Sequence, residues 1–314
     1  TGGASGAENS WASVIVATDE PTSISSSGFS LDSEIGFLMA GQTHTFSMQV
    51  EEANGIGTLD NITIMLCGDG PTNLGKMSYD PSRGNLWSSP DSMVTPMSVQ
   101  TESITSAVTK ISVQFALSWE YPWEESQSSC KPSVSIIDDL NTVAYQNNIG
   151  ELSWILDNKL IAIPDTLVDN TEPVMEAVEG QLFLRQGDEF SISGSIVYAG
   201  SAVPISEIPD GLTVEAVVIY GSQSVSSDAG VTPESRFTID VALPDRVPLS
   251  PYMGISVEVM NVPGLGSSES NEDYSVVVDS RSPTALFDQI SYPDSSLTII
   301  AVSYTHLTLP TRTH

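Results

Sequence analysis

Apolar and polar residues alternate with a period of two along most of this 314-residue chain. In the segment 110–119, the apolar positions are Ile111, Val113, Phe115, Leu117 and Trp119. The same alternation runs through the segments THTFSMQV, LTVEAVVIY, RFTIDV and GISVEVMN. Half-buried β-strands have this period, whereas an amphipathic helix repeats every 3.6 residues. Since no segment sustains a helical stripe, the sequence predicts an all-β fold.

A short frame, V-D-x-x-x-P, occurs twice, as VDNTEP at 168–173 and as VDSRSP at 278–283. The two prolines are 110 residues apart, a spacing that fits one β-sandwich domain of about 100 residues plus a linker. Six strands are expected between the two frames, at 181–184, 190–198, 212–220, 235–243, 254–261 and 273–279, with a seventh near 223–226. The stretch AGQTHTFSMQV (40–50) is similar to RQGDEFSISGSI (185–196), which favours tandem duplication.

These boundaries predict five segments. They are the end of a truncated upstream domain at 1–19, an enlarged sandwich at 20–167, a standard sandwich at 168–279, the start of a truncated third domain at 280–301, and a separate tail at 302–314.

At the level of strands and linkers, residues 20–301 resemble the tandem Ig-like β-sandwich repeats of large secreted or cell-surface prokaryotic proteins, including adhesin-like and surface-layer-like ones. The two linkers are similar to the Asp-Asn-Thr-Pro-Pro junctions of such arrays, with Glu172 and Ser282 in place of the first proline. The antibody-type Cys…Trp…Cys spacing is not evident. The resemblance implies tandem Ig-like β-sandwich domains with scaffold or adhesion roles.

The tail, VSYTHLTLPTRTH, contains no Asp or Glu, although the whole chain has 40. Its first ten residues can be back-translated to GTC TCT TAT ACA CAT CTG ACG CTG CCG ACG. That string is similar to the adapter of transposase-based sequencing libraries. We therefore expect 302–314 to be translated adapter and exclude it from the prediction of the fold. A natural C-terminal strand is the alternative.

The charge balance is strongly acidic, with 10 Lys and Arg against 40 Asp and Glu and a formal net charge of −30. Such a chain repels phosphate backbones and anionic lipids, so neither nucleic acid nor a membrane surface is an expected partner. No apolar run reaches 18 residues, so we expect no membrane insertion within the segment. An acidic, lysine-poor surface suits salty surroundings, which agrees with an extracellular or cell-surface location.

Cys67 and Cys130 are the two cysteines. They are too few for a four-cysteine zinc site. In an exported protein they could form a disulfide, and in a cytosolic protein they could be two buried thiols. Strand alternation places Cys67 on the face opposite Ile62 and Ile64, which complicates the disulfide.

The sequence contains few candidate catalytic residues. Without the tail, His44 is the single histidine, and it lies inside a predicted strand with no nucleophile elbow nearby. Residues 128–131 match S-x-x-K, the nucleophile motif of penicillin-binding proteins, which needs its lysine one helical turn after the serine. Here the motif begins a predicted strand, so the lysine does not have that position. We therefore expect no catalytic residues and a protein that is not an enzyme.

Calcium is the one metal that the sequence suggests, and no other cofactor is expected. Asp169, Asn170 and Glu172 at one linker, and Asp279 at the next, would supply hard oxygen ligands. The alternative is that Asp and Asn are good turn formers.

The stretch WEYPWEE, 119–125, places aromatic residues beside carboxylates. Tyr121, Trp123 and Glu124 could stack on sugar rings and accept hydroxyl hydrogen bonds. Trp119 continues the apolar face of the preceding strand and is expected to pack in the core.

Together these features predict a non-enzymatic fragment of a large extracellular or cell-surface protein, built from Ig-like spacer or adhesion modules. Its expected partners are neighbouring Ig-like domains of the same chain and surface glycans or proteins. The alternative is an accessory carbohydrate-binding sandwich of a secreted hydrolase whose catalytic domain lies outside the segment.

Overall fold

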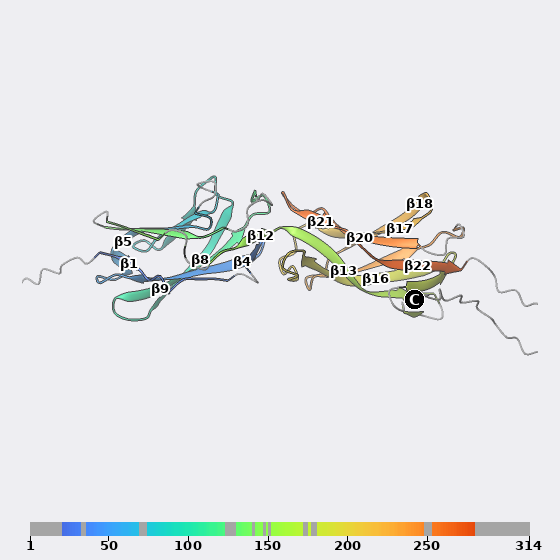
Figure 1. The fold of residues 1–314 in the computed structure, drawn as a ribbon, viewed down its shortest axis with the longest axis horizontal. Helices are drawn as coiled ribbons and strands as arrows, with labels where there is room; N and C mark the ends of the chain where they lie inside the picture. The colour runs from blue at the N-terminus through green and yellow to red at the C-terminus, as the bar shows by residue number, and fades with distance from the viewer. Residues whose placement is uncertain are drawn as a thin grey trace, which may run out of the picture.

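The computed structural model describes residues 21–32, 36–68, 74–122, 130–139, 142–146, 149, 152–171, 175–176, 181–247 and 253–279. Within them, two β-sandwiches lie end to end along the long axis of the molecule (Figure 1). The expected upstream domain, third domain and adapter tail all lie outside the described residues.

The first sandwich has two main five-stranded sheets. One sheet has the order β1-β4-β9-β8, with β2 also paired to β4. Its strands are β1 (Ser23–Ile24), β2 (Ser30–Leu31), β4 (Thr43–Glu51), β8 (Val94–Ser103) and β9 (Val108–Leu117). The other sheet has the order β11-β10-β5-β6-β7. Its strands are β5 (Leu59–Met65), β6 (Lys76–Asp80), β7 (Asn85–Ser88), β10 (Ser133–Asp138) and β11 (Val143–Gln146). A parallel pair, β3 (Phe37–Met39) with β12 (Ile155–Asp157), lies beside them, and a short 3-10 turn, η1 (Ile56–Thr58), precedes β5.

The second sandwich also has two five-stranded sheets. The first has the order β14-β13-β16-β19, with β21 paired to β13, and the second has the order β15-β22-β20-β17-β18. The first sheet contains β13 (Lys159–Asp169), β14 (Met175–Glu176), β16 (Glu189–Tyr198), β19 (Arg236–Ala242) and β21 (Ser267–Glu269). The second contains β15 (Gln181–Arg185), β17 (Thr213–Tyr220), β18 (Gln223–Gly230), β20 (Met253–Met260) and β22 (Asn271–Asp279). The strands predicted between 181 and 279 are therefore confirmed, most of them to within a residue or two.

Both sandwiches have an Ig-like strand order. In the first, β4 pairs with β9 in one sheet while the next strand along the chain, β5, pairs with β10 in the other. In the second, β16 pairs with β19 and β17 pairs with β20 in the same manner. This alternation of paired strands between facing sheets is the Greek-key arrangement of Ig-like domains. The predicted fold class is confirmed.

Each sandwich encloses its own hydrophobic core. Along β9, Ile111, Val113 and Phe115 are buried while the residues between them are only partly covered. Each fully buried side chain of this size contributes about 1.5–3 kcal/mol of burial free energy. The period of two in the sequence is thus the consequence of two sheets that each turn one face to a core.

The predicted domain boundary at 168–173 is wrong. β13, which contains 159–169, pairs along nearly its whole length with β16 of the second sandwich. Its residues Leu160, Ala162 and Leu167 are buried in the second core. The strand before it, β12, pairs with β3 of the first sandwich, so the boundary lies at Asn158, the single residue between β12 and β13.

The two sequence repeats have different structural meanings. The segments 40–50 and 185–196 lead into β4 and β16, which are equivalent strands of the two sandwiches. Gly41 and Gly187 each precede the strand with a positive φ, of 75° and 80°, a conformation that glycine adopts without strain. The V-D-x-x-x-P frames are not equivalent, because Asp169 ends the first strand of the second sandwich and Asp279 ends its last long strand.

Gly194 in β16 provides a stability test for the second sandwich. A Cβ atom there would lie 2.3 Å from the Ile163 carbonyl oxygen and 2.6 Å from the Phe237 ring. Gly194→Ala should therefore lower the free energy of unfolding by about 1–3 kcal/mol, the usual range for overpacking. Gly254→Ala in β20 is the matched control, since a Cβ at Gly254 would have no other atom within 4 Å. Denaturant titration followed by circular dichroism measures both. Equal effects of the two substitutions would contradict the packing.

Candidate functional site

The candidate functional feature is the interdomain seam, the contact between the two sandwiches on either side of Asn158. The linker backbone is held on both flanks. The Ala40 N–H of the first sandwich donates to the Asp157 carbonyl (3.0 Å), and the Ser267 N–H of the second donates to the Asn158 carbonyl (3.2 Å). A linker of one residue, with its own carbonyl bonded to the second sandwich and the preceding carbonyl bonded to the first, leaves little freedom for the two domains to reorient.

Trp119 is the aromatic centre of the seam. It follows β9 of the first sandwich, and its ring stacks on Tyr198 at the end of β16, with centroids 6.0 Å apart and planes at 16°. Its carbonyl oxygen accepts the Leu265 N–H of the second sandwich at 3.0 Å. Trp119 packs against both hydrophobic cores, so the expected core role is extended to a contact between domains.

Glycines make room for Trp119 on both sides of the seam. A Cβ at Gly41 would lie 2.4 Å from the indole Nε1, and a Cβ at Gly266 would lie 2.8 Å from the indole Cε3. At Gly264 a Cβ would lie 2.8 Å from the Trp119 backbone carbon. The loop NVPGLGSS (261–268) of the second sandwich is therefore shaped to receive this side chain.

Tyr198 ties its own sandwich to the backbone of the other. Its hydroxyl donates to the Ala40 carbonyl at 2.5 Å, and the whole side chain is buried. Burial raises the pKa of the Tyr198 phenol, with a smaller contribution from Asp157 and Glu207. The phenol therefore stays protonated and remains a hydrogen-bond donor across the physiological pH range.

Three polar side chains of the first sandwich complete the seam. The buried Asp157 carboxylate accepts the Ser201 N–H at 2.7 Å. The Gln42 carbonyl oxygen accepts the backbone N–H of Ser206 at 3.1 Å and also its hydroxyl. At the exposed margin, Thr43 donates to Glu207 at 2.8 Å. Because Asp157 and Gln42 hydrogen-bond to backbone groups of the facing domain, directional hydrogen bonds fix the relative orientation of the sandwiches in addition to the apolar contact between them.

The sequence predicts that Tyr121 contacts a ligand at the surface, but the structure buries it in the core of the first sandwich. It is 3% exposed and packs edge-on against Trp154, with ring centroids 6.0 Å apart. Burial raises the pKa of Tyr121 to about 12. Pro122 follows it, and the other predicted residues, Trp123 and Glu124, lie outside the described residues.

The structure joins Cys67 and Cys130 in a disulfide, with Cα atoms 4.8 Å apart. The expected conflict of strand faces does not arise, because Cys67 lies beyond the end of β5, where alternation stops. The bond links neighbouring ends of the paired strands β5 and β10, so it lies within one sheet. Antibody domains instead carry a disulfide between the two sheets.

The disulfide also anchors the strand that leads to the seam. Cys130 and Trp154 exchange two backbone hydrogen bonds, of 2.8 and 2.9 Å. The Trp154 indole N–H donates to the Leu66 carbonyl at 2.7 Å, next to Cys67. Because β12 begins directly after Trp154, the disulfide fixes the entry of the chain into the linker.

His44 has no ring nitrogen free for catalysis. Its Nδ1 lies 3.2 Å from the Asp32 carbonyl oxygen, and its Nε2 lies 3.1 Å from the Met39 backbone nitrogen and 3.0 Å from the Met39 carbonyl oxygen. The side chain is buried in β4. It positions the segment before β4 and offers nothing to a substrate.

The predicted calcium ligands do not lie at the boundary between the described sandwiches. Asp169 uses its carboxylate to accept the Thr171 N–H at 2.8 Å, and Asn170 donates to Ser191 at 2.5 Å. Asp169 and Asp279 end two strands of the same sandwich, and Glu172 lies outside the described residues. Among the described residues, no group of three or more His, Cys, Asp or Glu could hold a metal. A calcium site that includes Glu172 stays a prediction.

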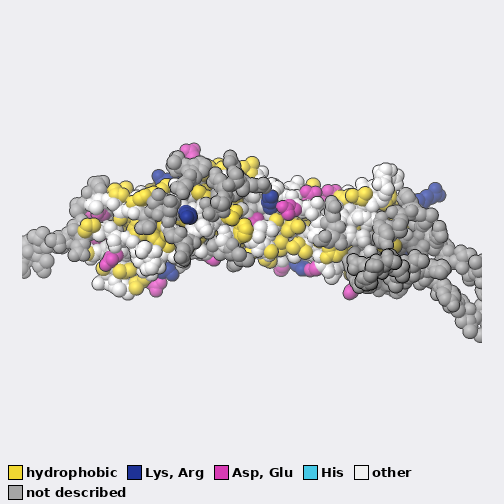
Figure 2. Space-filling view, in the orientation of Figure 1, with side chains coloured by type: hydrophobic (Ala, Val, Ile, Leu, Met, Phe, Trp, Pro, Cys, Tyr) yellow, Lys and Arg dark blue, Asp and Glu magenta, His cyan; other side chains and the backbone are white. Residues whose placement is uncertain are grey.

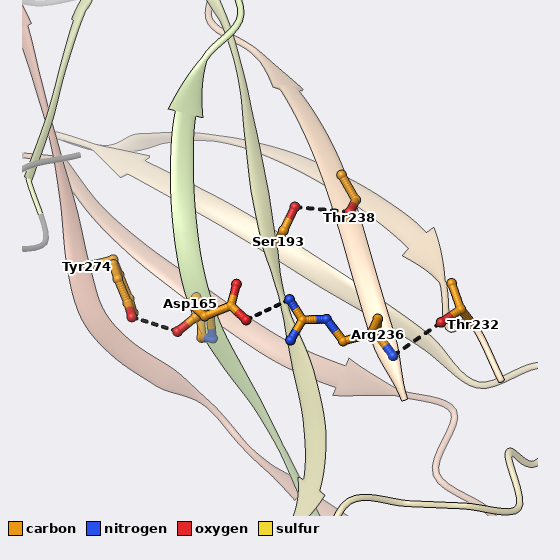
Figure 3. Close-up of polar contacts among 7 residues, drawn as sticks. Asp165, Ser193, Thr232, Arg236, Thr238 and Tyr274 are labelled. Carbon is orange, nitrogen blue, oxygen red and sulfur yellow. Dashed lines mark hydrogen bonds and ion pairs between the residues drawn. The ribbon is translucent and has the colours of Figure 1, made fainter. Parts of the chain in front are cut away.

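A polar cluster covers part of the β13-β16-β19 sheet (Figure 3). Asp165, at a bulge in β13, forms an ion pair with Arg236 of β19 at 2.6 Å. Ser193 and Thr238 share a hydrogen bond across β16 and β19 (3.0 Å), and the Tyr274 hydroxyl donates to the Pro164 carbonyl at 2.6 Å. The ion pair is half-exposed and contributes at most about 1 kcal/mol. These groups satisfy one another, so the cluster stabilises the sheet.

Acidic side chains are scattered over the visible face of both sandwiches (Figure 2). A shallow depression of about 270 Å³ at the outer end of the first sandwich is lined by Pro21, Ser23, Glu51, Ala53 and Ala107. Its one carboxylate, that of Glu51, already accepts a hydrogen bond from Ser23 at 3.3 Å. In the described part of the chain, no helix is long and apolar enough to cross a membrane.

The seam predicts a measurable coupling between Trp119 and Tyr198. Trp119→Ala should lower the free energy of unfolding by about 2–3 kcal/mol, because a large packed side chain is lost. A double-mutant cycle with Tyr198→Ala should give an interaction energy of about 0.5–1.5 kcal/mol, the range for an aromatic pair. Trp87→Ala, at an exposed position of β7, is the control and should cost less than 1 kcal/mol. Additive effects of Trp119→Ala and Tyr198→Ala would contradict the stacked contact.

Removal of the disulfide should lower the free energy of unfolding mainly of the first sandwich. Cys67 and Cys130 are 63 residues apart, so Cys67→Ser with Cys130→Ser should cost about 4 kcal/mol through the entropy of the unfolded chain. Among the described residues, Trp87 and Trp154 belong to the first sandwich and Trp119 lies at its seam with the second, so tryptophan fluorescence reports mainly the first sandwich. Its denaturation midpoint should fall more than the midpoint followed by circular dichroism. An unchanged fluorescence midpoint would refute the role of the bond.

No protein-family model matches the chain, and no curated protein matches it. Among solved structures, a marsupial T cell receptor is similar with a TM-score of 0.24 and 10% sequence identity, over 75% of this chain and 94% of that one. A likeness at this level carries no argument, so the Ig-like assignment rests on the strand order of the two sandwiches.

Proposed function

We propose that the described part of the chain is a rigid, non-enzymatic spacer that holds two Ig-like sandwiches in a fixed end-to-end orientation. The observation that carries this proposal is the seam, with one linker residue and side chains of each sandwich bound to the backbone of the other. A spacer must transmit position along its length, and a short linker between interlocked domains does so without the orientational freedom of a flexible one.

The proposed setting is an extracellular or cell-surface protein. A disulfide between Cys67 and Cys130 persists in an oxidising compartment and is rare in the cytosol. The net charge of −30 keeps the surface soluble where salt screens its self-repulsion. Adhesion by this or a neighbouring module of the same chain is part of the proposal.

The spacer role predicts that a flexible insertion at Asn158 changes the shape of the molecule. Small-angle X-ray scattering of the wild-type chain should fit one extended arrangement of the two sandwiches. A flexible insertion of six residues, all Gly or Ser, between Asn158 and Lys159 should broaden the distribution of interdomain distances, since such linkers behave as random coils.

The same insertion between Ser106 and Ala107, in the exposed turn from β8 to β9, is the control and should leave the interdomain distances unchanged. A wild-type distribution as broad as that of the Asn158 insertion would refute the rigid spacer.

A further inference from the structure

A row of five residues crosses the outer face of the β11-β10-β5-β6-β7 sheet in the first sandwich. Hydrogen-bonding register places one residue of each strand opposite the next. In strand order, the row is Tyr145, Ser135, Thr63, Ser78 and Trp87. Because directly opposed residues of antiparallel strands share a face, all five side chains leave the sheet on one side.

The two ends of the row are exposed aromatic rings. Tyr145 is 54% exposed and Trp87 is 44% exposed, while their neighbours Ala144 and Leu86 pack inward against the core. Four strand intervals separate the two rings, a distance of about 19 Å. An aromatic residue held outward at each margin of a sheet is not needed for the core, which lies on the opposite face.

Hydroxyl groups fill the space between the rings. Ser135 and Thr63 are half-buried, and Ser78 is buried beside them. The Asn61 amide donates to the Thr63 hydroxyl oxygen at 3.1 Å, and the Thr63 and Ser78 oxygens are 3.4 Å apart, at the limit of a hydrogen bond. Thr63 thus accepts a hydrogen bond from Asn61, and either Thr63 or Ser78 can donate in the contact between their hydroxyls.

No residue of the row is charged, although the chain as a whole carries a net charge of −30. A charged ligand would find no counter-charge in the row itself. A wholly apolar partner would offer the central hydroxyls no hydrogen bonds of its own. The matching chemistry is neutral, with apolar ring faces at intervals and many hydroxyls, which is the chemistry of sugars.

We propose that this face, the Trp87–Tyr145 row, binds an extended neutral oligosaccharide across the strands. Sugar rings stack on Trp87 and Tyr145, and the hydroxyls of Thr63 and Ser135 hydrogen-bond to the rings between them. The proposal goes beyond the spacer role and does not depend on the seam. It also differs from the site predicted around Tyr121, which is buried.

The test uses the whole chain and a panel of neutral hexasaccharides, namely β-1,4-, β-1,3- and α-1,4-linked glucans, β-1,4-mannan and β-1,4-xylan, by isothermal titration calorimetry. At least one should bind, with an affinity that is unchanged between low and high salt. Trp87→Ala and Tyr145→Ala should each weaken binding at least about tenfold, the effect of losing one stacked ring, and the double variant should not bind. Tyr145→Phe keeps the ring and should retain most of the affinity.

Phe183→Ala is the matched control, because Phe183 is an exposed aromatic residue of β15 in the second sandwich and should not affect binding. The melting temperature of each variant should lie within a few degrees of the wild type, since the substituted side chains are about half exposed and each substitution costs less than about 1 kcal/mol. Failure of every hexasaccharide to bind at millimolar concentration overturns the proposal, as does binding that survives the double variant. Self-association that Trp87→Ala abolishes, without sugar binding, would also overturn it and assign the face to contact between copies of the chain.

Discussion

The single residue Asn158 between β12 and β13 constrains the arrangement of everything else in the described structure. With no slack in the chain, the end of one sandwich and the start of the next must meet where their surfaces fit. The apolar part of this contact is the stacking of Trp119 on Tyr198. The polar part consists of the hydrogen bonds from backbone groups of the second sandwich to Asp157 and Gln42. The glycines around Trp119 allow the close approach that such a contact needs.

The disulfide and the seam form one continuous support. Cys130 is hydrogen-bonded to Trp154, Trp154 is hydrogen-bonded to Leu66, and β12 follows at once. A covalent bond inside one sheet therefore restrains, through these hydrogen bonds, the strand that carries the linker. The disulfide, which persists only under oxidising conditions, thereby contributes to the stiffness of the junction.

The sequence predicted the strands well, because alternating burial imposes the period of two on every strand that covers a core. It misplaced the domain boundary, because VDNTEP has the composition of a linker while the true junction at Asn158 has neither Pro nor Gly. Pairing of β13 with β16, which no local pattern reports, decided the assignment. In the same way, Tyr121 and Trp119 lie two residues apart, but one is buried beside Trp154 and the other reaches the second sandwich. The Trp87–Tyr145 row could not be predicted, since it depends on the register of strands whose members are up to 82 residues apart in sequence.

The central claim is that the two sandwiches share one orientation in solution. Residual dipolar couplings of backbone N–H groups, measured in a weakly aligning medium, give an alignment tensor for each sandwich separately. Tensors of equal magnitude and orientation are expected for the residues of β4–β11 and of β13–β22, because the seam makes the two domains one body. A clearly smaller tensor for one sandwich would mean that the domains reorient independently and would contradict the account.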